Sequence, residues 1–253
     1  SVEHVGCIGS DSDGLIAELG KAGISSRFVK VGFAPSGHAV IQVDEDGRNS
    51  IVISAGANRE LDSELIQDAI LRLEDTDWLL LQNETNGIAE AIELAAQEGK
   101  KVAINIAPAD ERMFDYPLSK VALIIVNELE AMALSSKPSP QLAFDWLINA
   151  YPEIDIVLTL GEEGVWSYRS KDAVRKGTGS FDIDATDETA AGDSFIGFLM
   201  AMLVAGRDLN ESIVLASAAG ALATTKPGAV DSIPTLDLVK TLAGEQDLKT
   251  VHI

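Results

Sequence analysis

Short apolar segments that alternate with helix-length amphipathic segments constrain the fold of this chain more than any other feature. Residues 78–81, 102–106, 121–126 and 154–160 are almost continuously apolar, and the segments between them, such as residues 88–97, have helical spacing. Strands without an alternating polar face are typical of a parallel sheet that is covered by helices on both sides. The pattern therefore predicts an α/β fold around a mostly parallel sheet.

One region departs from this rhythm. Residues 28–54 show the two-residue alternation of exposed strands, with Asp44-Glu45-Asp46-Gly47 between two extended runs. A turn sequence of this kind predicts a β-hairpin. A small antiparallel unit attached to a parallel sheet can serve as a lid or as a contact between two copies of the chain. Further along, residues 193–205 and 211–224 are predicted to form two long apolar helices.

Charge and composition limit the classes of function. The chain has 40 acidic and 19 basic side chains, a formal net charge of −21, and a single cysteine, Cys7. A surface with this much negative charge repels nucleic acids and anionic membranes. We therefore expect neither of them as a partner. No apolar stretch reaches the roughly 20 residues that cross a bilayer, and no signal peptide is expected. With a single cysteine, these features favour the cytoplasm.

The segment from Asp187 to Asp193 carries the strongest chemical signal. Three small residues, Ala190, Ala191 and Gly192, lead directly into a predicted helix. Small residues let the backbone approach a ligand, and the unpaired amides at a helix start bind anions such as phosphate. An aspartate at that point can accept a proton from a hydroxyl. Alternatively, Asp193 is only a first-turn acid that the helix dipole favours.

Two other segments follow predicted strands at the same edge of the sheet. Residues 158–165 form a strand followed by a glycine turn, which taken alone is a common structural element. Asn127 and Glu130 follow the strand that ends at Val126, where an amide and a carboxylate can hold hydrated magnesium. A helix cap explains Asn127 and Glu130 equally well when that segment is considered alone.

Together, these segments resemble the ribokinase-like (PfkB) sugar kinases, and the ribokinases most of all. The matching motifs run in family order over nearly all of the chain. They are the early glycines (Gly6, Gly9, Gly14), AGAN at 55–58, residues 105–109, NELE at 127–130, TLGEEGVW at 159–166 and DETAAGD at 187–193. The resemblance implies a three-layer α/β/α sandwich over residues 1–253 with a small lid hairpin at about 28–54.

The resemblance also implies roles for individual residues. Asp193 would be the catalytic base, with the amides of Ala190, Ala191 and Gly192 as an anion hole, and Glu84 would contact the sugar. ATP and Mg²⁺ would be the cosubstrate and metal. Asn127, Thr159, Gly161 and Gly164 would line the ATP site, and Glu130 would hold magnesium through water.

The resemblance also implies a site for a monovalent cation, which is K⁺ in this family. The loops of this chain match the cation-binding loops of the family, except at two positions. These loops contain Asp187, Thr189, Lys226, Gly228 and Ser232. Arginine is more usual in the family than Lys226, and Glu188 replaces a small residue. The family also forms homodimers through its lid hairpins, which is one arrangement open to this chain.

One departure concerns the substrate. Family members begin with a strand that carries a sugar-binding aspartate, followed by lid strands and a glycine-rich segment, and this stretch is absent here. We expect an incomplete chain, whose missing central strand leaves an apolar sheet edge exposed. The resemblance implies ATP-dependent phosphorylation of a pentose, with ribose as the first choice. A nucleoside, a fructose derivative or a sugar acid remains an alternative acceptor, and a non-catalytic nucleotide-binding protein is the alternative from another class.

Overall fold

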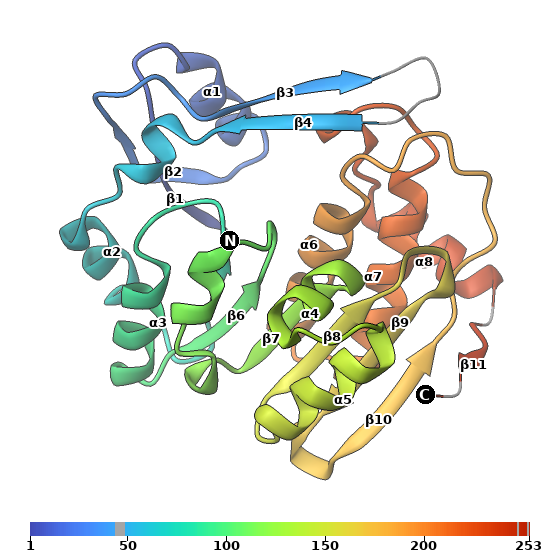
Figure 1. Cartoon of the computed structure of the whole chain (residues 1–253). Coiled ribbons are helices and arrows are strands. Elements are labelled where there is room, and N and C mark those ends of the chain that lie inside the picture. The colour runs from blue at the N-terminus through green and yellow to red at the C-terminus, as the bar shows by residue number, and fades with distance from the viewer. Residues whose placement is uncertain (44–48, 247, 252) are drawn as a thin grey trace.

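A seven-stranded sheet forms the centre of the molecule in the computed structural model, which describes residues 1–43, 49–246, 248–251 and 253. The strand order is β11-β10-β9-β8-β7-β6-β5 (Figure 1). Four strands run parallel: β5 (Trp78–Gln82), β6 (Lys101–Asn105), β7 (Leu123–Asn127) and β8 (Asp155–Thr159). Antiparallel strands β9 (Val165–Arg169), β10 (Val174–Thr178) and β11 (Thr250–Val251) extend the sheet beyond β8.

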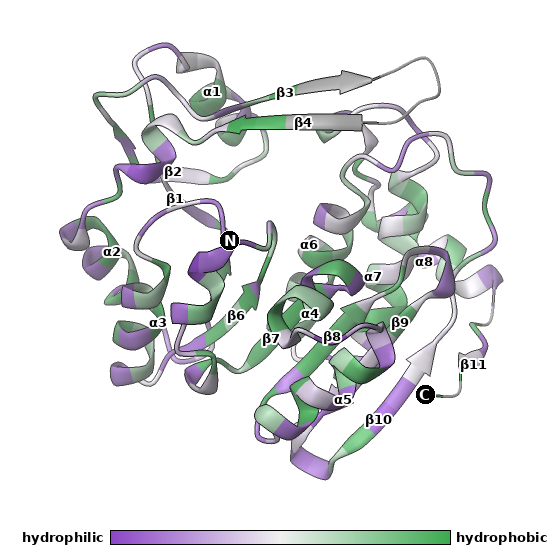
Figure 2. Ribbon diagram, viewed as in Figure 1, coloured by the Kyte–Doolittle hydropathy of each residue, from purple (hydrophilic) through white to green (hydrophobic). Residues whose placement is uncertain are grey.

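Both faces of the sheet are covered, because alternate residues of the same strands enter two different cores. In β7, Ile124 packs in one core with α2, α3, α4 and α5, whereas Ile125 packs in the other with α6 and α7. Figure 2 shows β6 to β8 as mainly hydrophobic strands between these helices. The helices of the first layer are α2 (Ser63–Ile70), α3 (Ile88–Gln97), α4 (Glu128–Ser135) and α5 (Pro140–Ala150). Those of the second are α6 (Ala191–Val204), α7 (Leu209–Ala223) and, packed on α7, α8 (Leu236–Glu245). The three-layer α/β/α sandwich is confirmed.

Two smaller sheets lie at the N-terminal end of the chain. β1 (Glu3–Ile8) and β2 (Ser25–Val31) pair in parallel and are joined by α1 (Asp13–Lys21). β3 (His38–Val43) and β4 (Asn49–Ser54) form the antiparallel hairpin that the sequence predicts, with His38 opposite Ser54. The predicted turn at residues 44–47 lies outside the described residues. In Figure 1 the hairpin extends from the β1–β2 side toward α6.

Short 3-10 helices complete the connections. They are η1 (Gly56–Arg59), η2 (Glu111–Asp115), η3 (Leu118–Lys120), η4 (Gly161–Glu163), η5 (Ser170–Asp172) and η6 (Val230–Ser232). No helix in the described part of the chain is both long and apolar enough to cross a membrane.

The outer edge of β5 has no partner strand among the described residues. All five residues of this strand retain some exposure, and Leu80 at its centre is 41% exposed. In β6, by contrast, the four residues after Lys101 are buried. Among the described residues, the apolar edge of the sheet that is partly open to solvent therefore lies at β5.

We expect truncation of Phe144 on α5 to destabilise the folded protein, because this side chain lies in the first core. Phe144 is fully buried, and its ring centroid lies 5.8 Å from that of Trp166. Phe144→Ala should lower the free energy of unfolding by about 3–5 kcal/mol, because it leaves a cavity. Chemical denaturation measures this, with Leu142→Ala as the control on the same helix, since Leu142 is 49% exposed. Equal losses for the two variants would contradict this account of the core.

Candidate active site

Polar residues gather where the parallel strands end. The strand register places Gln82 beside Asn105, and Asn127 beside Thr159. The Gln82 amide donates to the side-chain oxygen of Asn105 over 3.1 Å. Strands whose central side chains are apolar therefore end in polar residues at one common edge, which is where open α/β sheets bind ligands. Glu84 follows β5 at this same edge.

The start of α6 has the geometry of an anion site. Ala190, immediately before the helix, adopts the left-handed conformation with a φ of 60°. The Ala191 amide donates to the backbone carbonyl of Glu188. The amides of Gly192 and Asp193 have no hydrogen bond to another described residue. Gly192 and Asp193 are exposed, and a Cβ on Gly192 would meet open space. Two free N–H groups thus point from a helix start into accessible space.

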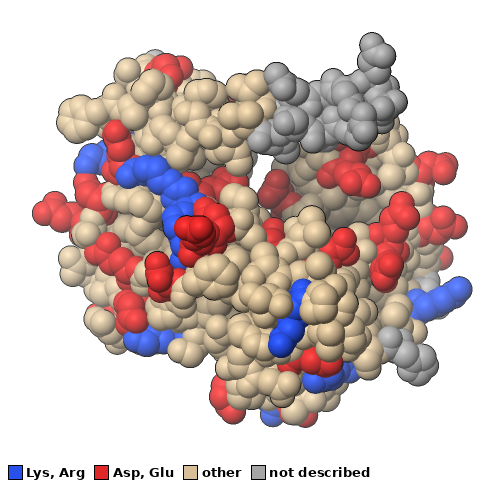
Figure 3. Space-filling model, in the orientation of Figure 1, with Lys and Arg blue, Asp and Glu red and all other residues tan. Residues whose placement is uncertain are grey.

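The charge of Asp193 affects the carboxyl group of Glu84. Partial burial raises the pKa of Glu84 above its ordinary value of 4.5, and the negative charge of Asp193 raises that pKa further. Figure 3 shows the surface hollowed between the part of the molecule that bears β3 and β4 and the main body. One carboxyl group comes from the loop after β5 and the other from the start of α6, so a ligand between them would contact both the sheet edge and the helix layer.

Asn127 and Glu130 form a reciprocal cap at the start of α4. The Asn127 side chain accepts from the Glu130 amide over 2.8 Å. The Glu130 carboxylate accepts from the Asn127 amide at 2.9 Å and from its side-chain nitrogen at 2.8 Å. Burial raises the pKa of Glu130, and the bond from the Asn127 backbone opposes that rise. Asn127 and Glu130 therefore do form a helix cap, as one of the two interpretations of this segment predicted. The cap leaves each carboxylate oxygen with a free lone pair that can accept from metal-bound water.

The glycine turn after β8 depends on two special positions. Gly161 and Gly164 have φ values of 54° and 100°, a region that favours glycine. A Cβ on Gly164 would lie only 2.1 Å from the carbonyl oxygen of Thr178 on β10. The turn therefore brings β9 back antiparallel to β8 and leaves Thr159 and Gly161 at the edge shared with Asn127.

The two loops predicted to hold a monovalent cation are joined directly. The Asp187 carboxylate accepts from the amide of Gly228 at 2.9 Å and from the hydroxyl of Thr189 at 2.6 Å. These bonds hold the pKa of Asp187 below its usual range. Lys226 is exposed, whereas Ser232 is buried and donates its hydroxyl to Ala229 at 2.8 Å. One Asp187 oxygen accepts two bonds from Thr189 and the other a single bond from Gly228, so the second oxygen keeps a lone pair that a cation could use together with other oxygens of these loops.

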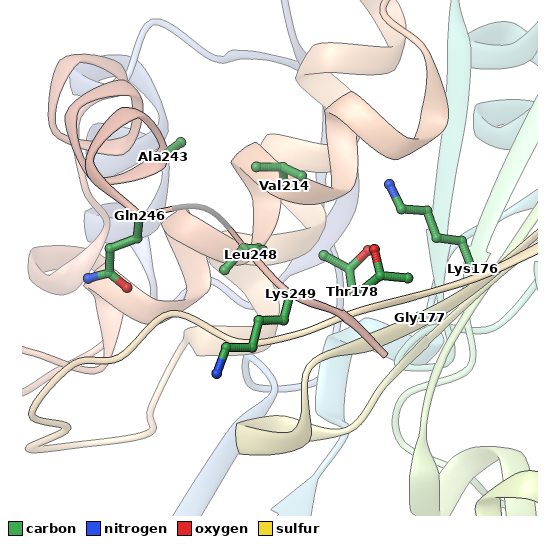
Figure 4. Close-up of a pocket in the computed structure, with 9 residues that line it drawn as sticks. Lys176, Gly177, Thr178, Val214, Ala243, Gln246, Leu248 and Lys249 are labelled. Atoms are coloured by element: carbon green, nitrogen blue, oxygen red, sulfur yellow. The ribbon is translucent and has the colours of Figure 1, made fainter. Parts of the chain in front are cut away.

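A separate cavity of about 200 Å³ lies between the outer strands of the sheet and α7 and α8 (Figure 4). Residues around it include Lys176 and Thr178 of β10, Val214 of α7 and Gln246 after α8. None of the residues predicted for the active site lines this cavity. The candidate active site is therefore the open cleft at the strand ends.

The loop that carries Glu84 is held by a residue that the sequence analysis did not single out. Arg112 of η2 donates to the carbonyl oxygens of Asn83 and Thr85 over 2.8 and 3.1 Å. The only sequence signal is an aspartate two residues earlier, Asp110, whose carboxylate also accepts from Arg112. Such spacing is too common to have identified the pair.

Comparison with known proteins identifies the family. A model of the pfkB family of carbohydrate kinases matches residues 1–236. The chain belongs to this family. It is 34% identical over 249 residues to the ribokinase of Haemophilus influenzae, an alignment that covers 92% of this chain and 78% of that relative. It is also 29% identical over 242 residues to the deoxyribokinase of Salmonella typhi, covering 91% and 78% of the two chains.

Solved structures support the same assignment. The ribokinase of Thermotoga maritima matches with a TM-score of 0.81 and 31% identity, over 96% of this chain and 81% of that one. A ribokinase of Cryptococcus neoformans, solved in complex with ADP, matches with a TM-score of 0.82 and 26% identity, over 95% and 82%. These findings confirm the resemblance and the fold. This pfkB-family protein is a sugar kinase, a phosphotransferase that acts on a sugar hydroxyl.

The coupling of the two cleft carboxyl groups in this pfkB-family kinase can be measured by titration. We expect the pKa of Glu84 to lie above 4.5 and to fall in Asp193→Asn, because that change removes the repelling charge. Carbon-13 NMR of labelled glutamate side chains measures this pKa, with Glu84→Gln to assign the resonance. A Glu84 pKa that is unchanged in Asp193→Asn would show that the two groups do not share the cleft.

The same shift has a consequence for stability. A carboxyl group that binds its proton more tightly when folded favours the folded state below its ordinary pKa and loses that contribution as the pH rises through the folded pKa. The stability of Glu84→Gln relative to the unsubstituted protein should therefore increase as the pH rises through this window.

Proposed function

We propose that this sugar kinase transfers the γ-phosphoryl group of ATP to a primary hydroxyl of a pentose, with ribose as the acceptor and ribose 5-phosphate as the product. The observation that carries the proposal is the start of α6, where the amides of Gly192 and Asp193 have no partner among the described residues and the charge of Asp193 raises the pKa of Glu84. The similarity to several ribokinases supports the choice of ribose.

In this proposal Asp193 is the catalytic base. Its carboxylate orients the sugar hydroxyl and accepts its proton as the hydroxyl attacks the γ-phosphorus atom. The amides of Gly192 and Asp193, next to Ala190 and Ala191, donate to the oxygens of the moving phosphoryl group. Because the protein has a net charge of −21, these local N–H dipoles offset a field that otherwise repels ATP.

Glu84 is proposed to bind the sugar, and Asn127, Thr159, Gly161 and Gly164 to line the ATP site. Asn127 and Thr159 are neighbours in the strand register, which supports a common role at one end of the nucleotide. Glu130, with Asn127, fits a role in holding the hydration shell of Mg²⁺. When bound, magnesium would neutralise charge on the phosphates of ATP. Asp187, Thr189, Lys226, Gly228 and Ser232 remain proposed residues of K⁺-binding loops, supported by the link between Asp187 and Gly228.

Replacing the proposed base should abolish most turnover. We expect Asp193→Asn to lower kcat by about 10²–10⁴-fold, because the variant cannot accept the hydroxyl proton. A coupled assay of ADP release with ribose, ATP and Mg²⁺ measures this, and ATP affinity should change little. Asp237→Asn is the matched control, since Asp237 also lies in the first turn of a helix, α8. Near-full activity of Asp193→Asn would refute the assignment.

The acceptor is tested in the same assay. The deoxyribokinase among the relatives makes 2-deoxyribose the second candidate. A higher kcat/KM for ribose than for 2-deoxyribose supports the proposal, and the reverse ratio replaces ribose with the deoxy sugar. Binding of ATP without ADP release in the presence of any sugar would instead favour a non-catalytic protein.

We also propose that two copies associate through the β3–β4 hairpin. An isolated two-stranded hairpin is only marginally stable in water. Val40, Val52 and Ile53 of this hairpin are 51%, 63% and 61% exposed, so a partner would cover apolar side chains. Light scattering should give the mass of a dimer, and Val52→Lys should shift it toward the monomer. A monomeric mass at all concentrations would contradict the proposal.

A further inference from the structure

The loop between β5 and α3 holds its polar side chains in hydrogen bonds with one exception. The Asn83 side chain donates to the Pro108 carbonyl over 2.6 Å and accepts from the hydroxyl of Tyr116. The Asn86 side chain accepts from the amide of Leu61 and donates to its carbonyl, at 3.1 and 2.7 Å. The side chain without a partner among the described residues is that of Glu84. The loop is therefore fixed around its single carboxyl group, that of Glu84.

A single guanidinium group fixes the backbone on both sides of Glu84. Arg112 donates from one nitrogen to the carbonyl of Asn83 at 2.8 Å and from another to the carbonyl of Thr85 at 3.1 Å. These carbonyl groups belong to the residues immediately before and after Glu84. Two parallel donors on a rigid planar group restrict both position and rotation, which a single point charge cannot do.

Arg112 is itself held in place. Its Nε donates to both carboxylate oxygens of Asp110, at 3.0 and 2.8 Å, and its backbone amide donates to Asp110 as well, at 2.9 Å. The guanidinium plane is therefore ordered by η2 before any ligand arrives. The side chains of Arg112 and Asp110 are 33% and 39% exposed, so the order of the guanidinium group comes from its several hydrogen bonds and not from burial of the ion pair.

The same loop is also tied to the part of the chain that leads out of the lid. Arg59, the last residue of η1, donates to the carbonyl of Thr85 over 2.7 Å. Arg59 follows the β3–β4 hairpin closely in sequence, so the Thr85 carbonyl joins η2 and the segment after the lid. Arg59 is exposed, however, and contacts only one side of Glu84. Arg112 is the residue that contacts both.

We infer that Arg112 is a positioning residue that acts through Glu84, fixing its carboxyl group for contact with the acceptor sugar. The inference rests on the proposed function for the role of Glu84. A protein group that hydrogen-bonds to a substrate must be placed to within a fraction of an ångström. Small displacements of such a group reduce the reaction rate steeply. Glu84 itself is exposed, so the support for this inference is the pair of hydrogen bonds from Arg112 to the backbone on either side of it.

Arg112→Lys is the sharpest test, because it keeps the positive charge and removes the two-pronged donor. We expect KM for ribose to rise about tenfold to a hundredfold, while KM for ATP stays within about twofold. Arg169→Lys is the matched control. Arg169 also pairs with carboxylates, those of Asp172 and Asp208, and lies on β9 and not in the Glu84 loop. It should leave KM for ribose unchanged.

A double-mutant cycle separates positioning from general destabilisation. If Arg112 acts through Glu84, Arg112→Lys should have little further effect on KM for ribose in a Glu84→Gln background. An equal loss in both backgrounds, or a parallel rise in KM for ATP, would overturn the inference in favour of a purely structural role.

A measurement that does not depend on activity distinguishes this inference from the proposed function. In Arg112→Lys, the released loop should become hydrated, and the pKa of Glu84 measured by carbon-13 NMR should fall toward 4.5. A fall in pKa without ribose-dependent turnover in the unsubstituted protein would support the clamp on Glu84 and refute the proposed function. An unchanged Glu84 pKa with unchanged KM for ribose would overturn the inference and leave the kinase assignment intact.

Discussion

The burial of β6 to β8 on both faces is the constraint on which the rest of this structure depends. Alternate side chains of these strands enter two cores, so helices must cover the sheet from both sides. A parallel arrangement follows, since each helix carries the chain back to start the next strand. The four parallel strands, β5 to β8, then end at one edge, and the residues that follow them are free to be polar. The active site is placed by the core and not by contacts within the site itself.

Electrostatics explains why that edge must be built from backbone groups. The chain has 21 more acidic than basic charges, and both residues proposed to meet the sugar are carboxylic acids. A phosphate can approach only where dipoles are oriented toward it, and the first turn of α6 supplies them after the left-handed Ala190. The negative charge of Asp193 raises the pKa of Glu84, and an acceptor with several hydroxyl groups could donate hydrogen bonds to both carboxylates.

The sequence alone predicted the elements whose side chains follow a clear period. The predicted helix at residues 88–97 has the bounds of α3, and the strands near residues 80, 104, 124 and 157 are all present. The motif at 187–193 located the helix start because small residues and an acid in that order are uncommon. The separate β1–β2 sheet and the antiparallel strands β9 to β11 were not predicted. Their pairing depends on contacts between distant segments, which short-range patterns do not encode. Arg112 was missed for a similar reason, since its partners lie almost thirty residues away.

The large negative charge also affects how the exposed edge of β5 meets other molecules. An unpaired apolar strand is a template for pairing with a strand of another molecule, and Leu80 lies open at its centre. Among like-charged molecules, long-range repulsion opposes that approach before the edges can meet. At physiological salt this repulsion decays over about 8 Å, so protection by charge weakens as ionic strength rises. Between molecules that expose this edge as the described residues do, added salt would therefore make contact at β5 easier.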